Sequence, residues 1–103
     1  MSEFTGNRYL TKGIQNEIPI ELQLILWNMI DEDKQQKKLL DYLQVFELKS
    51  LYKKGKFLQE ITHKQEQPYR KKKITMDSDN PISAKIFVID DVSHITMLLS
   101  NEY

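Results

Sequence analysis

The sequence predicts an α+β fold in which one main amphipathic helix, over about residues 19–36, packs on a largely antiparallel five- or six-stranded sheet. Two observations support this prediction. Between Pro19 and Glu32, large apolar side chains recur at the spacing of a helix, and this stretch holds the only tryptophan. After residue 38 the pattern changes to the alternation that is typical of strands. The predicted element order is β-α-β-β-β-β-β.

Length and composition indicate a single domain. A chain of 103 residues can bury a core without covalent cross-links, and it contains no cysteine. The first ten residues lack the pattern of a secretory signal, and no apolar run is long enough to span a membrane. We therefore expect a soluble cytoplasmic protein, one domain over residues 1–103, with residues 1–6 frayed.

The predicted helix has a clear beginning and a gradual end. Residues 7–14, which precede it, predict a first strand that ends near Gly13. Pro19 restricts the residue before it to an extended conformation and suits the first helical position, and Glu21 favours the helix dipole. No glycine or proline follows before residue 55, so we expect the helix to fray between Lys34 and Lys38.

The remaining chain predicts the strands that cover this helix. Residues 39–49 alternate with apolar side chains on both faces, which is typical of a strand inside a sheet. The cluster around Gly55 predicts a hairpin loop, and the strand at 57–66 that follows should have one solvated face. Residues 69–76 carry four consecutive basic residues, as suits an edge strand. Residues 84–90 and 94–100 predict an antiparallel hairpin.

Several phrases of the chain resemble a family of small proteins from Firmicutes, catalogued as domain of unknown function number nine hundred and sixty. The phrases are RYLTKGI at 8–14, EIPIELQLILW at 17–27, LDYLQVFEL at 40–48, HKQEQP at 63–68, NPISAKIFVIDD at 80–91 and TMLLSNEY at 96–103. Between Lys49 and Lys56 the resemblance is weakest. Membership would imply a compact cytoplasmic α+β domain, and it would supply no catalytic residue.

The charge of the chain is unevenly placed. Between Lys53 and Lys73 there are eight basic and two acidic residues, so this segment carries +6 and the remainder −6. Tyr52, Phe57 and Tyr69 lie among the cations, as in sheets that bind nucleic acid. The alternative interpretation is a solvated edge that resists aggregation. The candidate macromolecule-binding residues are Lys53, Lys54, Lys56, Lys64, Tyr69, Arg70, Lys71, Lys72 and Lys73.

The apolar arc of the helix is wider than one face of a small sheet can cover. We therefore consider Ile20, Leu24 and Trp27 as a possible interface with a partner protein or with a second copy of the chain. The alternative is that the strand after Leu39 and the N-terminal segment cover the arc completely.

Residues with the chemistry of an active site are few. His63, Glu66, Asp90, Asp91 and His94 could serve a metal or acid-base site, but their spacing matches no metal motif. On a strand, His63 and Glu66 point to opposite faces. We predict no catalytic, cofactor-binding or metal residue, and hence no cofactor. The sequence favours a non-enzymatic protein-interaction module, with a nucleic-acid-binding domain as the alternative and an enzyme around His63 or His94 third.

Overall fold

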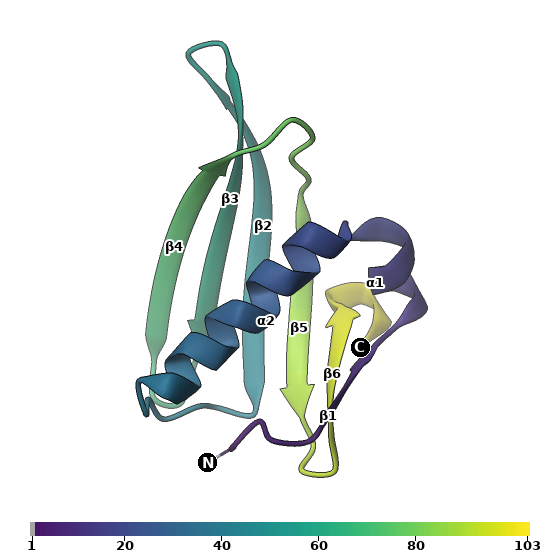
Figure 1. The fold of residues 1–103 in the computed structure, drawn as a ribbon, viewed down its shortest axis with the longest axis vertical. Coiled ribbons are helices and arrows are strands. Elements are labelled where there is room, and N and C mark those ends of the chain that lie inside the picture. Colours follow the sequence, from purple (N-terminus) through teal and green to yellow (C-terminus); the bar gives the residue numbers. More distant parts are fainter. Residues whose placement is uncertain (1) are drawn as a thin grey trace.

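A long helix crosses one face of a six-stranded sheet in the computed structural model, which describes residues 2–103 (Figure 1). The elements are β1 (Asn7–Leu10), α1 (Lys12–Glu17), α2 (Ile20–Gln35), β2 (Leu43–Lys53), β3 (Lys56–Gln65), β4 (Arg70–Asp77), β5 (Ala84–Asp90), β6 (His94–Leu99) and the short 3-10 helix η1 (Ser100–Glu102). The predicted α+β class and the predicted order of the main helix and six strands are confirmed. The strand after the main helix begins at Leu43, later than expected, and continues to Lys53.

The strands lie in the order β1-β6-β5-β2-β3-β4. Four of the five neighbouring pairs are antiparallel, and β1 pairs with β6 in parallel. The basic strand β4 is an edge strand, as predicted, and β2 lies in the interior of the sheet. The predicted hairpin of β5 and β6 is also confirmed. Within residues 2–103, no helix is both long and apolar enough to cross a membrane.

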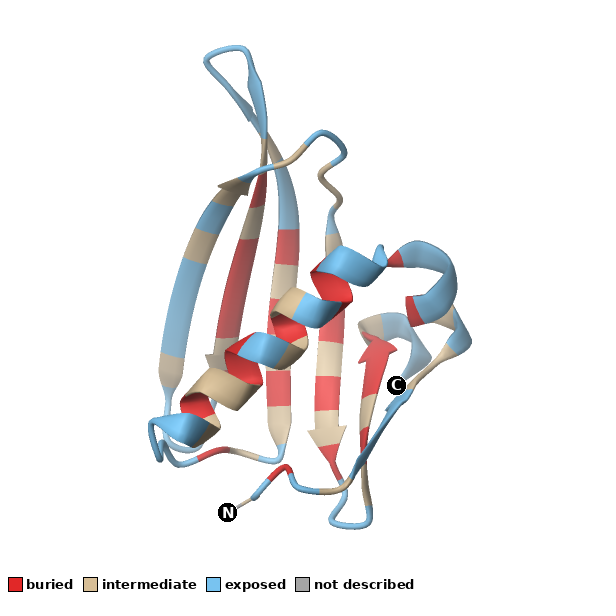
Figure 2. Cartoon of the chain, viewed as in Figure 1, coloured by how far each residue is buried: buried red, intermediate tan, exposed pale blue. Residues whose placement is uncertain are grey.

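Helix α2 begins where Pro19 was expected to start it. The carbonyl of Pro19 accepts hydrogen bonds from the amides of Leu22 and Gln23, at 3.0 and 3.1 Å. Glu21 in the first turn and Lys34 in the last complement the helix dipole. The buried residues of α2 face the sheet (Figure 2), and they are Leu22, Gln23, Leu26, Met29, Ile30 and Asp33.

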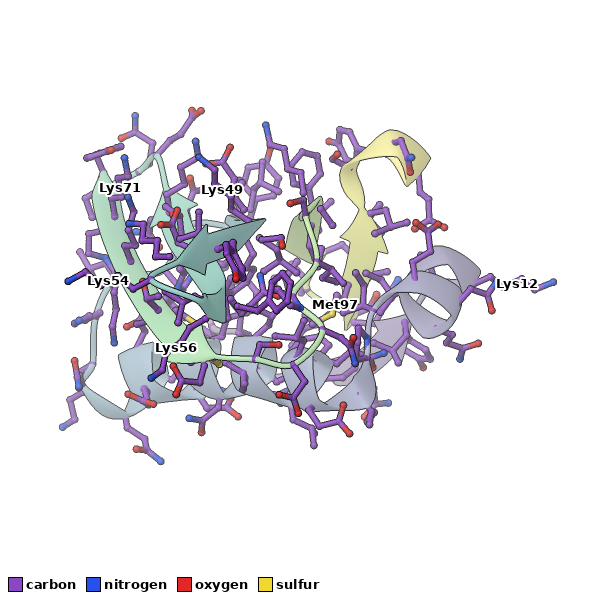
Figure 3. All side chains as sticks on the ribbon, turned by 90° about the horizontal axis from the view of Figure 1, so that it is seen from above. Lys12, Lys49, Lys54, Lys56, Lys71 and Met97 are labelled. Carbon is purple, nitrogen blue, oxygen red and sulfur yellow. The ribbon has the colours of Figure 1, made fainter. Side chains whose placement is uncertain are left out.

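The hydrophobic core lies between α2 and the sheet. Figure 3 shows the sheet with α2 along one face and Met97 between the two, whereas Lys49 and Lys71 point away from the helix. The fully buried strand residues on the helix side include Phe46, Ile61, Ile86, Val88 and Met97. Helix α2 therefore covers one face of the sheet, and the opposite face carries charged side chains.

The expected strand over residues 7–14 is wrong beyond Leu10, because the chain turns into α1. The Thr11 hydroxyl caps α1 by accepting a hydrogen bond from the amide of Ile14, at 3.3 Å. Ile14 itself is completely buried. The carboxylate of Glu102 accepts further bonds from the Thr11 hydroxyl and the Gly13 amide, at 2.6 and 3.2 Å. The first turn of α1 is thus held by the other end of the chain.

The expectation that residues 1–6 are frayed is wrong for residues 2–6, and Met1 lies outside the described residues. The amide of Ser2 donates to the carbonyl of Leu40, at 3.1 Å. Phe4 is only 1% exposed, and its amide donates to Oδ2 of Asp90 at 2.9 Å. The N-terminal segment is therefore part of the packed structure.

Strand β3 buries polar residues on the side that faces α2. Gln59, His63 and Gln65 alternate with solvent-side residues and are buried with Ile61 on the same face. Gln44 of the neighbouring strand β2 is fully buried as well. Glutamine and histidine are often solvated, so these residue types alone did not predict that this face is buried. A polar cluster consequently lies beneath the C-terminal end of α2.

Candidate anion-binding pocket

A pocket of about 380 Å³ opens between the end of α2 and the strands β3 and β4. Its side chains come from stretches far apart in the sequence, because α2 crosses the sheet and ends beside the start of β4 (Figure 1). We name it the basic pocket. Its charged and titratable lining residues are Asp33, Lys38, His63, Lys64, Arg70, Lys71 and Lys72.

His63 forms the inner wall of the basic pocket. Its ring is 6% exposed and stacks on Phe46, with 4.3 Å between ring centroids. Nε2 of His63 lies 2.6 Å from Oε1 of Gln44. The Gln44 amide is oriented by two bonds from its nitrogen, to the carbonyl of Asp41 and to Oε1 of Gln65. Since an amide oxygen can only accept, Nε2 of His63 is the protonated nitrogen.

The pKa of His63 is lowered from 6.5 to about 4, chiefly because burial disfavours the charged ring. The negative charge of Asp33 acts in the opposite direction, and the positive charges of Arg70 and Lys72 lower the pKa further. His63 is therefore neutral at pH 7. With Nε2 protonated, Nδ1 has a free lone pair that can accept a hydrogen bond.

Arg70 connects the pocket to the loop before β2. One terminal nitrogen of its guanidinium donates to the carbonyl of Leu39 and to Oε1 of Gln65, both at 3.0 Å. The other terminal nitrogen lies 3.3 Å from Oδ2 of Asp33. The remaining nitrogen, Nε, is buried and has no hydrogen-bond partner among the described residues. A buried donor without a partner is costly, so a ligand atom or water that reached it would be favoured.

The charges around the pocket are predominantly positive. Asp33 is the one carboxylate that lines it, and Lys38 lies 3.5 Å from this side chain, on the opposite oxygen from Arg70. Lys72 stands opposite His63 in the pairing of β3 with β4, and it forms no ion pair within residues 2–103. Lys38, Arg70 and Lys72 together exceed Asp33 by two charges. This arrangement suits a phosphate or carboxylate group.

The structure divides the predicted basic segment between two places. Lys64, Tyr69, Arg70, Lys71 and Lys72 line the basic pocket. Lys53, Lys54 and Lys56 lie at the far end of the β2–β3 hairpin. Lys64 follows Lys56 by eight positions along an extended strand, a distance of about 26 Å.

The last member of the predicted set, Lys73, turns away from the pocket. Its amino group lies 3.9 Å from Oε1 of Glu60. The nine predicted residues therefore do not form one continuous surface.

The three residues predicted as an interface differ in how far they are exposed to solvent. Ile20 and Leu24 are 56% and 60% exposed, and they lie one turn apart on α2. Trp27 is only partly exposed, and the Arg8 guanidinium lies 4.7 Å from the centre of its ring. Two side chains are thus available to a partner on this side of α2.

His94 does not lie near His63. His94 begins β6, three strands from β3, which is at least about 14 Å. Its Nε2 lies 3.0 Å from Oδ2 of Asp91 in an exposed turn. The pKa of Asp91 is lowered, chiefly by the hydrogen bond that its carboxylate accepts from the backbone amide of His94. In the described part of the chain, no three histidine, aspartate or glutamate side chains are grouped to hold a metal ion.

Sequence reasoning missed four residues that shape the basic pocket. They are Asp33, Lys38, Gln44 and Gln65. The available signal was the position of Gln59, His63 and Gln65 on the same face of the strand as Ile61. A row of amides and a histidine in phase with a buried isoleucine indicates a polar group beneath the helix.

The fold and the pocket define a small α+β protein with one helix-covered sheet face and a basic, polar pocket at the end of that layer. The chain belongs to the family described as "Staphylococcal protein of unknown function", domain of unknown function 960, whose profile matches residues 7–102. The expected family resemblance is thereby confirmed.

One solved structure shares the fold along the whole chain. It is described as the crystal structure of the protein of unknown function from Enterococcus faecalis. The TM-score is 0.73 at 26% sequence identity, over 100% of this chain and 97% of that chain. Comparison with curated proteins gives no match.

Proposed function

We propose that this protein is a non-enzymatic cytoplasmic binding module that recognises an anionic group of a partner protein in the basic pocket. The observation that supports the proposal is the convergence of Lys38, Arg70 and Lys72 on a pocket whose one carboxylate, Asp33, is already paired. Charge-assisted hydrogen bonds from such cations are among the stronger contacts that a binding site can form.

The pocket also has donors and an acceptor that fit a phosphate group. Arg70 Nε is a buried donor without a partner, and Lys72 has an unpaired ammonium group in the described structure. Nδ1 of neutral His63 can accept a hydrogen bond from a ligand hydroxyl, which a hydrogen phosphate has and a carboxylate lacks. A volume of about 380 Å³ lies within the range of small-ligand sites.

The state of His63 favours binding over acid-base catalysis. A catalytic base at neutral pH works best when its pKa is near 7, and the pKa of His63 is about 4. Its ring is oriented by the neutral amide of Gln44, and no carboxylate lies within hydrogen-bonding distance among the described contacts. His94 has a carboxylate partner in Asp91, but this pair lies in an exposed turn outside the basic pocket.

The test is a titration of the labelled protein with inorganic phosphate and, separately, with acetate, followed by NMR. We expect saturable shifts of the His63 ring and of the backbone amides at the start of β4, larger for phosphate. Lys72→Glu should weaken phosphate binding at least tenfold because it reverses the one unpaired cation beside His63. Lys12→Glu, an exposed position on α1, is the charge-matched control and should change binding less than twofold.

Shifts that never saturate, or that Lys72→Glu and Lys12→Glu reduce equally, would contradict an anion site in the basic pocket. The protein partner is tested separately by affinity capture from cells with the same two variants. Only a partner that is lost with Lys72→Glu and retained with Lys12→Glu supports the proposal.

A further inference from the structure

The β2–β3 hairpin extends beyond its neighbours as a two-stranded arm, at the top of the view in Figure 1. The last residue of β2 that pairs with β5 is Leu48, opposite Ala84. On the other side, β4 ends its pairing with β3 at Leu58, opposite Asp77. We name residues 49–58 the arm. Between these limits β2 and β3 form ladder pairs only with each other, and the base of the arm is held by two further hydrogen bonds, from the amide of Ser78 to the carbonyl of Phe57 and from the amide of Ser50 to the hydroxyl of Ser83.

The arm closes with a tight turn at Lys54 and Gly55, whose φ angles are 51° and 77°. Successive residues with positive φ match the twist of a two-residue hairpin, and glycine adopts the second position without strain. The strands are therefore paired up to Lys53 and Lys56, and the apex of the arm is formed by lysines.

The arm carries four cations and no carboxylate. The cations are Lys49, Lys53, Lys54 and Lys56. Lys56 has a partner outside the arm, Asp77 at 3.5 Å, but both side chains are largely exposed, and such pairs are weak. The local charge of the arm is therefore strongly positive, although the whole chain has a net charge of zero.

Two aromatic side chains are exposed just behind the apex. Tyr52 and Phe57 stand opposite each other across the hairpin and are 64% and 53% exposed. Their ring centroids lie 4.8 Å apart at an interplanar angle of 60°. The two rings contact each other, and each keeps surface that a flat ligand could cover.

We propose that the arm is a contact site for single-stranded nucleic acid. Its lysines would bind backbone phosphates, and Tyr52 and Phe57 would stack on unpaired bases, which is the pairing of groups that single strands require. A duplex hides its base faces, so the exposed rings favour single strands. A membrane would meet the lysine apex before the rings, whereas anchoring in a bilayer needs the apolar groups in front.

The arm and the basic pocket lie at opposite ends of β3, about 26 Å apart. The inference is therefore independent of the proposed function. Variants of the arm should leave phosphate binding in the basic pocket unchanged, and variants of the basic pocket should leave binding to the arm unchanged. Failure of one proposal can therefore be distinguished from failure of the other.

The experiment measures fluorescence anisotropy of a labelled single strand of about twelve nucleotides, with a duplex of equal length and phosphatidylserine vesicles as competitors. We expect the single strand to bind more tightly than the duplex. If three or four lysines bind phosphates, affinity should fall about twentyfold to fiftyfold between 50 and 200 mM salt, from a slope of roughly −0.7 per phosphate.

Two double variants separate the contributions of charge and stacking. Lys53→Glu with Lys54→Glu should weaken binding at least tenfold. Tyr52→Ser with Phe57→Ser should weaken it about tenfold or more at unchanged salt dependence, since stacking contributes about 1–3 kcal/mol per base. The charge-matched control, Lys12→Glu with Lys37→Glu, lies outside both the arm and the basic pocket and should change affinity less than threefold.

Equal losses in the control and the lysine variant would overturn the proposal, because they would reflect net charge alone. So would equal affinity for the duplex, binding to vesicles without binding to the single strand, or no effect of removing both rings. In a further variant, Asn-Gly replaces residues 52–57. The new turn connects the paired residues Leu51 and Leu58 directly, so the outer part of the arm is removed. This variant should keep the thermal midpoint within a few degrees, keep phosphate binding and lose the single strand.

Discussion

His63 occupies the centre of the polar cluster beneath α2, where it contributes both packing and a hydrogen bond. Its ring stacks on Phe46 and donates to Gln44, and the amide of Gln44 is held in turn by Gln65. In the folded protein the neutral ring is strongly preferred, as the lowered pKa shows. In the unfolded chain the same ring would have an ordinary pKa near 6.5.

This difference predicts a pH dependence of stability. Because the unfolded state binds the proton more tightly, the stability supplied by neutral His63 is complete above pH 6.5 and is lost as the pH falls toward 4. The full loss is about 3 kcal/mol for a pKa lowered to about 4. Urea unfolding at pH 7 and pH 4.5 should show a larger decrease for the natural protein than for His63→Gln.

The comparison with His63→Gln removes the contribution of the carboxylates, which titrate in both proteins. If the two proteins lose the same free energy of unfolding between pH 7 and pH 4.5, His63 is not buried in its neutral form.

Only part of the pocket could be predicted at the scale of residues. The sequence pointed to His63, Arg70 and Lys72 as separate candidates, one for acid-base chemistry and two for a basic surface. It could not show that they meet, because their contacts pass through Gln44 on β2, Gln65 on β3 and Asp33 on α2. Lysine, arginine and glutamine are usually solvated, so their types alone do not indicate burial.

At the scale of elements, helix α1 and the C-terminal turn η1 depend on each other. The Glu102 carboxylate accepts hydrogen bonds from the Thr11 hydroxyl, the Gly13 amide and the Leu99 amide. These bonds lower the pKa of Glu102, with the Thr11 hydroxyl as the largest cause. A Cβ at Gly13 would lie 2.7 Å from this carboxylate, so any other residue at position 13 would displace the Glu102 side chain.

We therefore expect Glu102→Ala to loosen both elements while the sheet remains intact. The amides of Gly13 and Leu99 should exchange their hydrogens faster, because each loses its acceptor. Hydrogen exchange followed by NMR measures this directly. Glu66→Ala, an exposed glutamate in the turn before β4, is the control, and faster exchange at the same two amides in that variant would contradict the assignment.

The local sequence pattern predicted the strands and α2, but it did not predict α1. Alternation placed the strands, and Pro19 with the apolar spacing placed α2 within a residue or two of its observed bounds. Helix α1 is too short to show a periodic face, and its cap is completed by Glu102, 89 residues after Gly13. Local helix propensity cannot predict a contact between residues so far apart in the sequence.

At the scale of the whole molecule, the N-terminal segment closes one end of the core. Phe4 packs into the core, and its backbone amide donates a hydrogen bond to the carboxylate of Asp90, while Ser2 pairs with Leu40. The expected fraying was based on a polar composition with no period. The prediction failed because a single buried aromatic ring can anchor a segment that has no regular secondary structure.

Phe4→Ala should destabilise the protein by about 3–5 kcal/mol, since a buried phenylalanine is replaced by a cavity. Chemical denaturation with tryptophan fluorescence measures the loss, and Trp27 provides the signal. Leu24→Ala is the control, because this apolar residue of α2 is 60% exposed and its replacement should change stability by less than about 1 kcal/mol. Similar midpoints for the natural protein and Phe4→Ala would show that residues 2–6 detach.

The parallel pairing of β1 with β6 has a consequence for synthesis of the chain. Residues 7–10 find their hydrogen-bonding neighbour only in residues 94–97, which follow the strands β2 to β5 in the chain. A nascent chain can assemble the β2–β3–β4 meander early, since those strands are consecutive, but its first strand must wait. The sheet therefore cannot be completed until β6 has been synthesised, and a chain that ends before β6 exposes the edge of β5.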